Sequence, residues 1–233
     1  MIKAVLTIFF ALMFMSCEVK EVQLEKIESL TTGKYELNRI LLEETSTNAW
    51  LLCNDKKKCI LIDPAFKSKN IAKTINKKNY TVMAIFLTHN HWDHSKEINA
   101  LSEKLNAPIV TNQKQIEMGK SQLGTEITVT NIEKVSNHDI LKMGDLSLEI
   151  LFSPGHSMGS MCFYHEESNS LFSGDTLFKR SIGRTDFYGS ESDKIINSIF
   201  TVLNSVKGNA VVFPGHGDST TKEHELKYNP FLQ

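Results

Sequence analysis

The sequence lacks a strong net charge, an apolar run long enough to cross a bilayer as a helix, internal repeats and low-complexity segments. Its 233 residues carry a formal net charge of -1 at pH 7, from 26 Lys and Arg against 27 Asp and Glu. Without a basic excess the chain lacks the electrostatic footprint of a nucleic-acid-binding protein, so we expect no nucleic-acid partner. Hydrophobic residues make up 41% of the chain, which is enough for one sizeable core, and the length favours a single large domain.

The amino-terminal residues resemble an export signal rather than part of a folded domain. Ala4 to Met15 is an apolar run interrupted only by Thr7, and Lys3 is the only charged residue near it. A membrane-spanning helix needs about 20 apolar residues, so this run is too short to span, but its length suits the core of a secretory signal. The run is followed by Ser16-Cys17, which resembles the processing site of a bacterial lipoprotein.

We therefore expect residues 1–16 to be a lipoprotein-type signal peptide, Cys17 to be lipidated, and residues 17–32 to be a polar tether. Residues 33–233 would then form an exported domain that a lipid anchors to the membrane, on the periplasmic side or at the cell surface. An ordinary cleaved signal and an uncleaved anchor are the alternatives, because Phe14 and Met15 depart from the usual residues before such a cysteine. The sequence leaves the oligomeric state open.

The chain has four cysteines, and two of them lie close together. Cys53 and Cys59 flank a lysine-rich turn, and a disulfide between them would close a short loop and stabilise the fold little. We favour two free thiols at the ends of neighbouring strands, although an oxidising compartment would permit the disulfide. Cys162 lies in an apolar strand pattern and is predicted to be a core residue.

Strand and helix patterns alternate along residues 33–233, which predicts an α/β layered fold. Short apolar runs bounded by turn residues indicate strands, and apolar residues at helical spacing indicate helices. Residues 121–140 are polar and weakly patterned, so we expect a surface excursion there. The predicted strands are 49–52, 59–62, 82–87, 108–111, 146–152, 161–164, 171–173 and 210–213, and the predicted helices are 68–78, 95–105, 113–120 and 190–204.

Side chains that can bind metal cluster directly after a predicted buried strand. Residues 89–94 read His-Asn-His-Trp-Asp-His, which places three histidines and one aspartate within six residues. Such side chains are costly to bury together without a cation. His89 and His91 can share one side of an extended loop while Asp93 and His94 turn to the other side. The segment therefore offers two separate sets of ligands.

Three later strands each deliver one further side chain of this kind behind a turn residue. His156 follows a Pro-Gly pair, Asp175 follows a glycine, and His216 follows another Pro-Gly pair. Glycine allows the backbone to approach a ligand closely at such points. Five of the eight histidines thus stand at strand ends, and we interpret the other three as solvated surface residues: His138, His165 and His224.

The ordered set HxHxDH, PGH, SGDTLF and PGH resembles the metallo-β-lactamase superfamily, in its glyoxalase II-like branch of short, single-domain proteins similar to hydroxyacylglutathione hydrolases. The resemblance covers nearly all of residues 33–233 and includes Gly-Arg-Thr-Asp at 183–186 and Asn-Pro-Phe at 229–231. It implies a four-layer αββα sandwich that holds two divalent metal ions, with zinc expected and iron or manganese as alternatives. By motif position, His89, His91 and His156 would bind the first ion, Asp93, His94 and His216 the second, and Asp175 would bridge them.

The resemblance implies thioester hydrolysis, in which a metal-bridging hydroxide attacks the thioester carbonyl and Asp93 also orients the nucleophile. Larger members have a further helical region that supplies much of the glutathione site, and only seventeen residues follow His216, so the acyl and thiol groups of the substrate stay open. One alternative is a persulfide dioxygenase with a single iron. A periplasmic metallo-β-lactamase is less favoured, because such enzymes lack a bridging aspartate at this point.

Basic residues near the SGDTLF segment are candidates for contact with a small-molecule substrate. Lys179 and Arg180 follow it directly, although a solvated loop is the favoured interpretation for both. Arg184 is a third candidate, and an ion pair with Asp186 is the competing interpretation. We expect Trp92 to pack beneath the ligand loop rather than to line a pocket.

The lipoprotein interpretation predicts that Cys17→Ala releases the protein from membranes, because the substitution removes the thiol that would carry the lipid. Membrane and soluble fractions of cells that produce the variant are compared by immunoblotting. Cys162→Ala is the control, and it is expected to stay with the membranes. Continued membrane association of the Cys17 variant would contradict lipidation.

Overall fold

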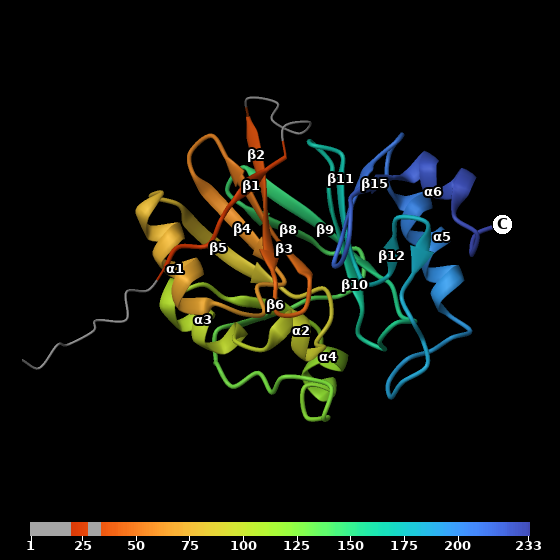
Figure 1. The fold of residues 1–233 in the computed structure, drawn as a ribbon, viewed down its shortest axis with the longest axis horizontal. Helices are drawn as coiled ribbons and strands as arrows, with labels where there is room; N and C mark the ends of the chain where they lie inside the picture. Colours follow the sequence, from red (N-terminus) through yellow and green to blue (C-terminus); the bar gives the residue numbers. More distant parts are fainter. Residues whose placement is uncertain (1–19, 28–33) are drawn as a thin grey trace, which may run out of the picture.

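The computed structural model describes residues 20–27 and 34–233, and two β-sheets lie at its centre (Figure 1). The predicted signal peptide and Cys17 lie outside the described residues. In spatial order, the first sheet contains β1 (Glu25–Lys26), β2 (Tyr35–Leu42), β3 (Thr47–Asn54), β4 (Lys58–Ile62), β5 (Thr81–Phe86), β6 (Ile109–Thr111) and β7 (Ile132–Lys134). The second contains β15 (Thr220–Thr221), β14 (Val211–Pro214), β11 (Ser170–Gly174), β10 (Met161–His165), β9 (Leu146–Phe152) and β8 (Ile140–Met143).

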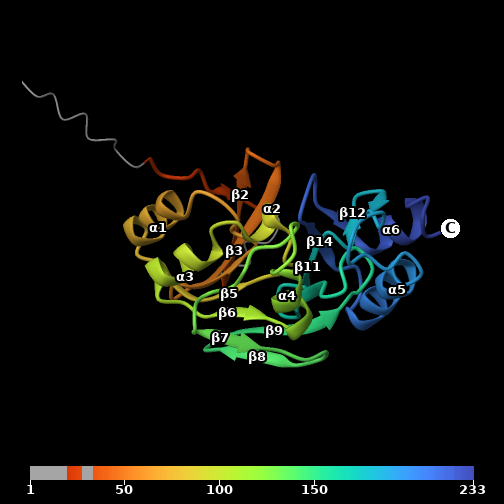
Figure 2. The same cartoon turned by 90° about the horizontal axis from the view of Figure 1, so that it is seen from below.

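Helices cover the outer face of each sheet, which confirms the predicted four-layer αββα sandwich (Figures 1 and 2). The first sheet is covered by α1 (Ser68–Lys77) and α3 (Ile98–Leu105), and the second by α5 (Ile195–Ser205) and α6 (Lys222–Tyr228). The remaining helices are α2 (Trp92–Ser95) and α4 (Gln113–Met118), and β12 (Leu177–Phe178) forms a small hairpin with β13 (Ser181–Ile182). Within the described ranges, no helix has the length and apolar character needed to cross a bilayer.

Alternation of side chains along the strands builds three apolar layers. In β3, Trp50 and Leu52 belong to the core between the two sheets, whereas Leu51 and Cys53 face the helices of the first sheet. Successive side chains of a strand point to opposite faces, so one strand supplies both cores. A third cluster packs α5 against the second sheet and includes Cys162, the predicted core cysteine.

All the predicted strands are present. The eight-residue β2 is not among the predicted ranges, and the other differences concern short elements. The predicted helix 95–105 begins only at Ile98, as α3, because α2 ends at Ser95 and a turn follows it, and the predicted helix 190–204 begins only at Ile195. The predicted surface excursion 121–140 contains β7, which adds a parallel strand to the edge of the first sheet. β12, β13 and β15 have only two residues each, which is too few to show the alternation of a strand in the sequence.

The described part of the predicted tether belongs to the domain, which corrects that prediction for residues 20–27. Val22 and Leu24 pack against the core beneath the first sheet. β1 pairs with β2, and Arg39 on β2 forms an ion pair with Glu25 at 2.5 Å. The alternating apolar residues of this segment were too few to predict a strand, and pairing with an existing sheet edge stabilises it.

Cys53 and Cys59 form a disulfide, which corrects the prediction of two free thiols. The two residues lie directly opposite each other in the antiparallel pair of β3 and β4, with their Cα atoms 4.0 Å apart. Antiparallel pairing itself therefore places the two sulfur atoms side by side, and the short loop between them is the turn of the hairpin.

His165 is fully buried, which corrects its interpretation as a surface residue. Its Nδ1 accepts a hydrogen bond from the backbone N–H of Ser168, and its ring packs edge-on against Tyr35 with the centroids 4.6 Å apart. Burial lowers the pKa of His165 to about 4. His138 is exposed as predicted and pairs with Glu149, whereas His224 is only partly exposed. Because its neighbours in the sequence are polar, His165 at the end of β10 was predicted to lie at the surface.

The buried His165 predicts a loss of stability in acid, because the unfolded chain takes up a proton there at a higher pH than the folded chain. The folded pKa is about 4 against an ordinary 6.5, so His165 alone should lower the free energy of unfolding by about 3 kcal/mol as the pH falls through this window. Urea unfolding of wild type and His165→Asn at pH 7 and pH 4.5 measures it. The variant should lose less stability than wild type, whereas His138→Asn should behave as wild type. Equal losses in wild type and His165→Asn would show that His165 does not control this window.

Candidate metal centre

The structure brings together all seven side chains predicted to bind metal, from loops at the ends of four strands. His89 lies shortly after β5, His91 is the residue before α2, and Asp93 and His94 lie within α2. His156 lies in the loop after β9. Asp175 directly follows β11, and the last ligand, His216, lies shortly after β14. The sequence prediction that each of these strands delivers its ligand at its end agrees with this placement.

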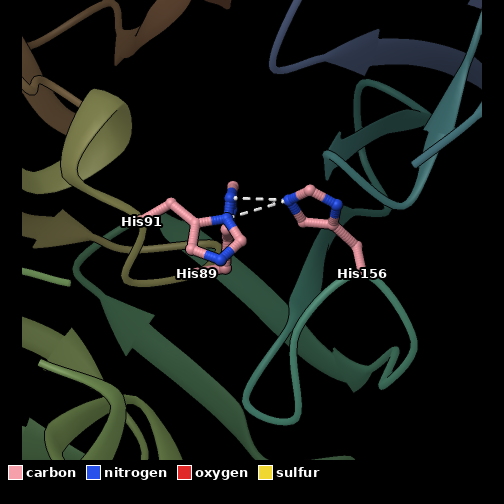
Figure 3. A group of neighbouring side chains, drawn as sticks. All are labelled: His89, His91 and His156. Carbon is pink, nitrogen blue, oxygen red and sulfur yellow. Dashed lines mark hydrogen bonds between the residues drawn. The ribbon is translucent and has the colours of Figure 1, made fainter. Parts of the chain in front are cut away.

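One cluster consists of three histidines whose ring nitrogens converge (Figure 3). His156 Nε2 lies 3.0 Å from His91 Nδ1 and 3.2 Å from His89 Nε2. A neutral imidazole carries only one N–H, so its other ring nitrogen has a free lone pair. In this cluster one ring nitrogen of each histidine is directed at a common point. Three imidazole nitrogens around one point are the ligand set of a divalent transition metal.

A second cluster consists of Asp93, His94 and His216. His216 Nε2 lies 3.3 Å from both His94 Nε2 and Asp93 Oδ2, and His94 Nε2 lies 3.7 Å from the same carboxylate oxygen. Two imidazoles and one carboxylate form a second set of three ligands suited to a divalent ion.

Asp175 lies between the two clusters. Its Oδ1 lies 3.3 Å from His94 Nε2, and its Oδ2 lies 3.6 Å from His156 Nε2 and 3.5 Å from His216 Nε2. The side chain is buried, and Oδ1 has no hydrogen-bond partner. A buried carboxylate oxygen without a donor is unfavourable, so these residues fit a cation on each side of Asp175.

Asp63 supports the centre, and its place in an Asp-Pro pair directly after a strand gives no sign of this role in the sequence. Asp63 follows β4, and its Oδ2 lies 2.9 Å from His94 Nδ1. Its two carboxylate oxygens also accept hydrogen bonds from the backbone N–H and the hydroxyl of Thr88, at 2.7 and 2.5 Å. Asp63, His89 and His94 could themselves surround an ion, but with these donors in place we interpret Asp63 as the residue that orients His94.

Backbone carbonyls orient two further histidines in the same way. His156 Nδ1–H donates to the carbonyl of Arg184 at 2.9 Å, and His216 Nδ1–H donates to the carbonyl of Ser46 at 3.0 Å. A proton held on Nδ1 leaves the lone pair of Nε2 free to bind a metal.

The pKa values of the first cluster favour the state that binds metal. Burial and the neighbouring imidazoles lower the pKa of His89 well below its usual range, and burial lowers the pKa of His91 to about 4 and also that of His156. The three rings are therefore neutral at pH 7, which ligation requires. Burial alone would raise the pKa of Asp175, but His94 and the other neighbouring histidines together outweigh burial, so the pKa is lowered and the carboxylate is ionised.

In the second cluster, nearby carboxylates raise the pKa values of the two histidines. Burial alone would lower the pKa of His94, yet Asp175 and Asp63 raise it well above the usual range. The pKa of His216 is also raised, because the hydrogen bond with Asp93 and the charge of Asp175 outweigh burial. The carboxylates thus favour a cation at this point, and a bound metal ion would supply it.

Two glycines allow the strand ends to meet at the centre, as expected from the sequence. A Cβ on Gly215 would lie 2.2 Å from Asp175 Oδ1 and 2.7 Å from His94 Cε1. Gly174 has φ of +49°, and a Cβ there would lie 2.4 Å from the hydroxyl of Thr88. Only glycine fits these positions without displacing the ligands.

A pocket of about 610 Å³ opens onto the metal-binding side chains and contacts both clusters. Trp92 lines it with 44% of its surface exposed, which corrects the expectation that it packs beneath the loop. Arg184 also lines the pocket and forms the expected ion pair with Asp186, at 2.6 and 2.8 Å. Lys179 and Arg180 are exposed and do not line it, and Lys179 pairs with Asp218, so substrate contact is not retained for these two.

Comparisons with known proteins agree with this geometry. The family model described as the metallo-beta-lactamase superfamily matches residues 42–216. The chain is 34% identical to the probable metallo-hydrolase YqgX of Bacillus subtilis (strain 168), over 79% of this chain and 92% of that protein. It is 30% identical to the hydroxyacylglutathione hydrolase GloC of Haemophilus influenzae (strain ATCC 51907 / DSM 11121 / KW20 / Rd), over 79% of this chain and 92% of that protein.

Solved structures show the same similarity. The BLEG-1 B3 metallo-beta-lactamase superposes with a TM-score of 0.78 at 29% identity, over 84% of this chain and 99% of that one. The structure of TTHA1623 in a di-iron-bound form superposes with a TM-score of 0.73 at 27% identity, over 83% of this chain and 99% of that one.

If Asp63 orients His94, Asp63→Asn should weaken metal binding while leaving the fold intact. Loss of such a supporting carboxylate lowers metal affinity by about 10- to 100-fold. Titration of metal-free protein with zinc against a chelating indicator measures the change. Asp145→Asn, which removes a carboxylate paired with Lys56 on the surface, is the control and should bind zinc as wild type does. Equal affinity in the Asp63 variant and wild type would contradict the role of Asp63.

Proposed function

Because the chain belongs to the metallo-beta-lactamase superfamily, we propose that it is a hydrolase that uses two divalent metal ions to cleave thioesters. The observation that carries this proposal is the position of Asp175, whose carboxylate lies between two complete sets of ligands. The second set, Asp93, His94 and His216, offers three ligands to a second ion beside the one that the three histidines would hold.

The residues around the centre suit hydrolysis of an activated carbonyl. Two bound metal ions would lower the pKa of a water molecule and polarise a carbonyl oxygen. Asp93 belongs to a ligand cluster and also lines the pocket, so its carboxylate can orient a water molecule toward the substrate. The hydrogen bond from His216 and the charge of His94 outweigh burial and lower the pKa of Asp93, so it is ionised and able to accept that hydrogen bond.

The reaction that we propose adds one water molecule across the thioester. The water oxygen forms a bond to the acyl carbon, the carbon–sulfur bond breaks, and the sulfur leaves as a thiol with a proton that the water supplied. The products are one carboxylic acid and one thiol. No oxidant or further cofactor is needed, which distinguishes this reaction from that of the persulfide dioxygenase alternative.

Thioesters are our preferred substrates because the chain combines its two clusters with similarity to a hydroxyacylglutathione hydrolase over most of both chains. Its similarity to a B3 metallo-beta-lactamase makes β-lactam hydrolysis the competitor to test beside thioesters. Since a similar protein holds two iron ions, the number of bound ions rather than the element separates the hydrolase from a dioxygenase with a single iron.

We also propose that the enzyme acts outside the cytoplasm, attached to a membrane through a lipid on Cys17. The support is the apolar run 4–15 followed by Ser16-Cys17. The disulfide between Cys53 and Cys59 fits this location, because disulfides persist in oxidising compartments.

The bridging role of Asp175 predicts that Asp175→Asn abolishes thioester hydrolysis. Metal ions supply several kcal/mol of stabilisation to the transition state, so kcat/KM should fall by at least about a hundredfold. Release of thiol from S-acetyl-N-acetylcysteamine measures the activity, with a β-lactam and a persulfide assayed in parallel.

The control for this experiment is Asp193→Asn, which changes an exposed aspartate away from the pocket and should retain activity. Unchanged turnover in the Asp175 variant would refute the two-metal mechanism. Oxygen uptake with a persulfide, without thioester hydrolysis, would favour the dioxygenase instead.

A further inference from the structure

The pocket above the metal centre has an apolar wall. Five of its lining residues have apolar or largely apolar side chains, and they come from three separate segments of the chain: Trp92, Leu123, Phe178, Ile182 and Phe187. The polar lining is concentrated in the metal-binding side chains. Apart from Ser181 and Arg184, the lining beside the candidate metal ligands is therefore apolar.

The apolar wall begins directly at both ligand clusters. The ring centroid of Phe187 lies 4.9 Å from that of His91 and 5.1 Å from that of His156, in the first cluster. The ring of Phe178 lies 6.2 Å from His216, in the second cluster. A carbonyl group bound at the ions would therefore have apolar surface within reach of its neighbouring carbon atoms.

Charge on the pocket wall is neutralised. Arg184 is the only lysine or arginine among the described residues that line the pocket, and Asp186 binds its guanidinium through two hydrogen bonds. The guanidinium carbon also lies 5.2 Å from the centre of the Phe187 ring. Among the described residues that line the pocket, no unpaired lysine or arginine is therefore positioned to bind a carboxylate or a phosphate group of a substrate.

Helix α6 fixes one side of the apolar wall. The hairpin of β12 and β13 carries Phe178 and Ile182, and the buried carboxylate of Glu225 accepts a hydrogen bond from the backbone N–H of Arg180 at 2.8 Å. Asn229 Nδ2 donates to the carbonyl of Ser181 at 3.1 Å and to Glu225 at 2.8 Å. These contacts hold the hairpin in place before a substrate arrives, which lowers the cost of binding.

We propose that this pocket selects thioesters by an apolar acyl chain of medium length, and that it does not discriminate between their thiol groups. The inference rests on the proposed thioesterase function and adds the class of substrate. Common biological thiols such as glutathione carry carboxylates, which an apolar wall would have to desolvate without a cation to pair with. The acyl group is the part of a thioester that can be wholly apolar, so it packs against the apolar wall.

The size of the pocket and the hydrophobic effect set the expected selectivity. Pockets of about 300–1,000 Å³ bury small organic ligands, and this pocket of 610 Å³ lies within that range. Each fully buried methylene group favours binding about fourfold. Since the pocket is open to solvent on one side, we expect a gain of at least about tenfold between acetyl and hexanoyl.

The test uses the metal-loaded protein and two series of thioesters, on N-acetylcysteamine and on glutathione, each with acetyl, butyryl and hexanoyl groups. Within each series kcat/KM should rise at least about tenfold from acetyl to hexanoyl, mainly through KM. Lactoylglutathione should be a poorer substrate than hexanoylglutathione. A flat dependence on chain length, or a preference for lactoylglutathione over the hexanoyl thioesters, would overturn the inference.

Two variants locate the selectivity in the pocket. Trp92→Ala removes part of the wall without removing a ligand, so it should lower kcat/KM for hexanoyl at least about threefold more than for acetyl. Tyr188→Ala is the matched control, because Tyr188 is 70% exposed and does not line the pocket. The same loss for both acyl groups in the Trp92 variant would place the selectivity elsewhere.

A binding measurement separates this inference from the proposed function. Calorimetry should show that hexanoate binds the metal-loaded protein at least about tenfold more tightly than acetate, with a negative heat-capacity change from apolar burial. Thioester cleavage at similar rates for all chain lengths, together with equal binding of the two carboxylates, overturns the inference and leaves the thioesterase standing. Absence of cleavage for every thioester overturns both.

Discussion

The structure depends on one buried carboxylate, that of Asp175, held among imidazoles from three segments of the chain. His94, His156 and His216 each place Nε2 within 3.6 Å of it. A buried carboxylate needs positive charge nearby. Asp175 raises the pKa values of His94 and His216, so it favours positive charge on these rings, and a bound metal ion would supply that charge instead. Metal ions would satisfy both the carboxylates and the imidazoles, and this charge balance supports the proposed two-metal centre.

The two sheets bring these side chains together because each contains a parallel pair of strands that ends at the centre. In the first sheet β4 pairs with β5, so Asp63 and His89 follow neighbouring strand ends. In the second sheet β11 pairs with β14, which places Asp175 beside His216. The carboxyl ends of parallel strands lie at one edge of a sheet, and packing the sheets face to face joins the two edges. The rigid core thereby positions the ligands before any metal binds.

The strands and the ligand loops could be predicted from the sequence because both depend on local order. Apolar runs identify strands such as β5. Segment 89–94 contains three histidines and one aspartate, a composition that is not typical of a hydrophobic core. The role of Asp63 could not be predicted, since it depends on a contact with His94 that lies 31 positions away in the chain. The burial of His165, the disulfide and the pocket-lining positions of Trp92 and Phe187 likewise follow from packing between distant segments, for which a single sequence carries no signal.

The most direct test of the central claim, that the chain is built to hold two metal ions, is elemental analysis of metal per chain in protein purified without residues 1–16. The proposed two-metal centre predicts two equivalents of divalent metal, as zinc, iron, manganese or a mixed pair. A single equivalent that does not rise to two when metal is supplied, or no metal at all, would contradict it.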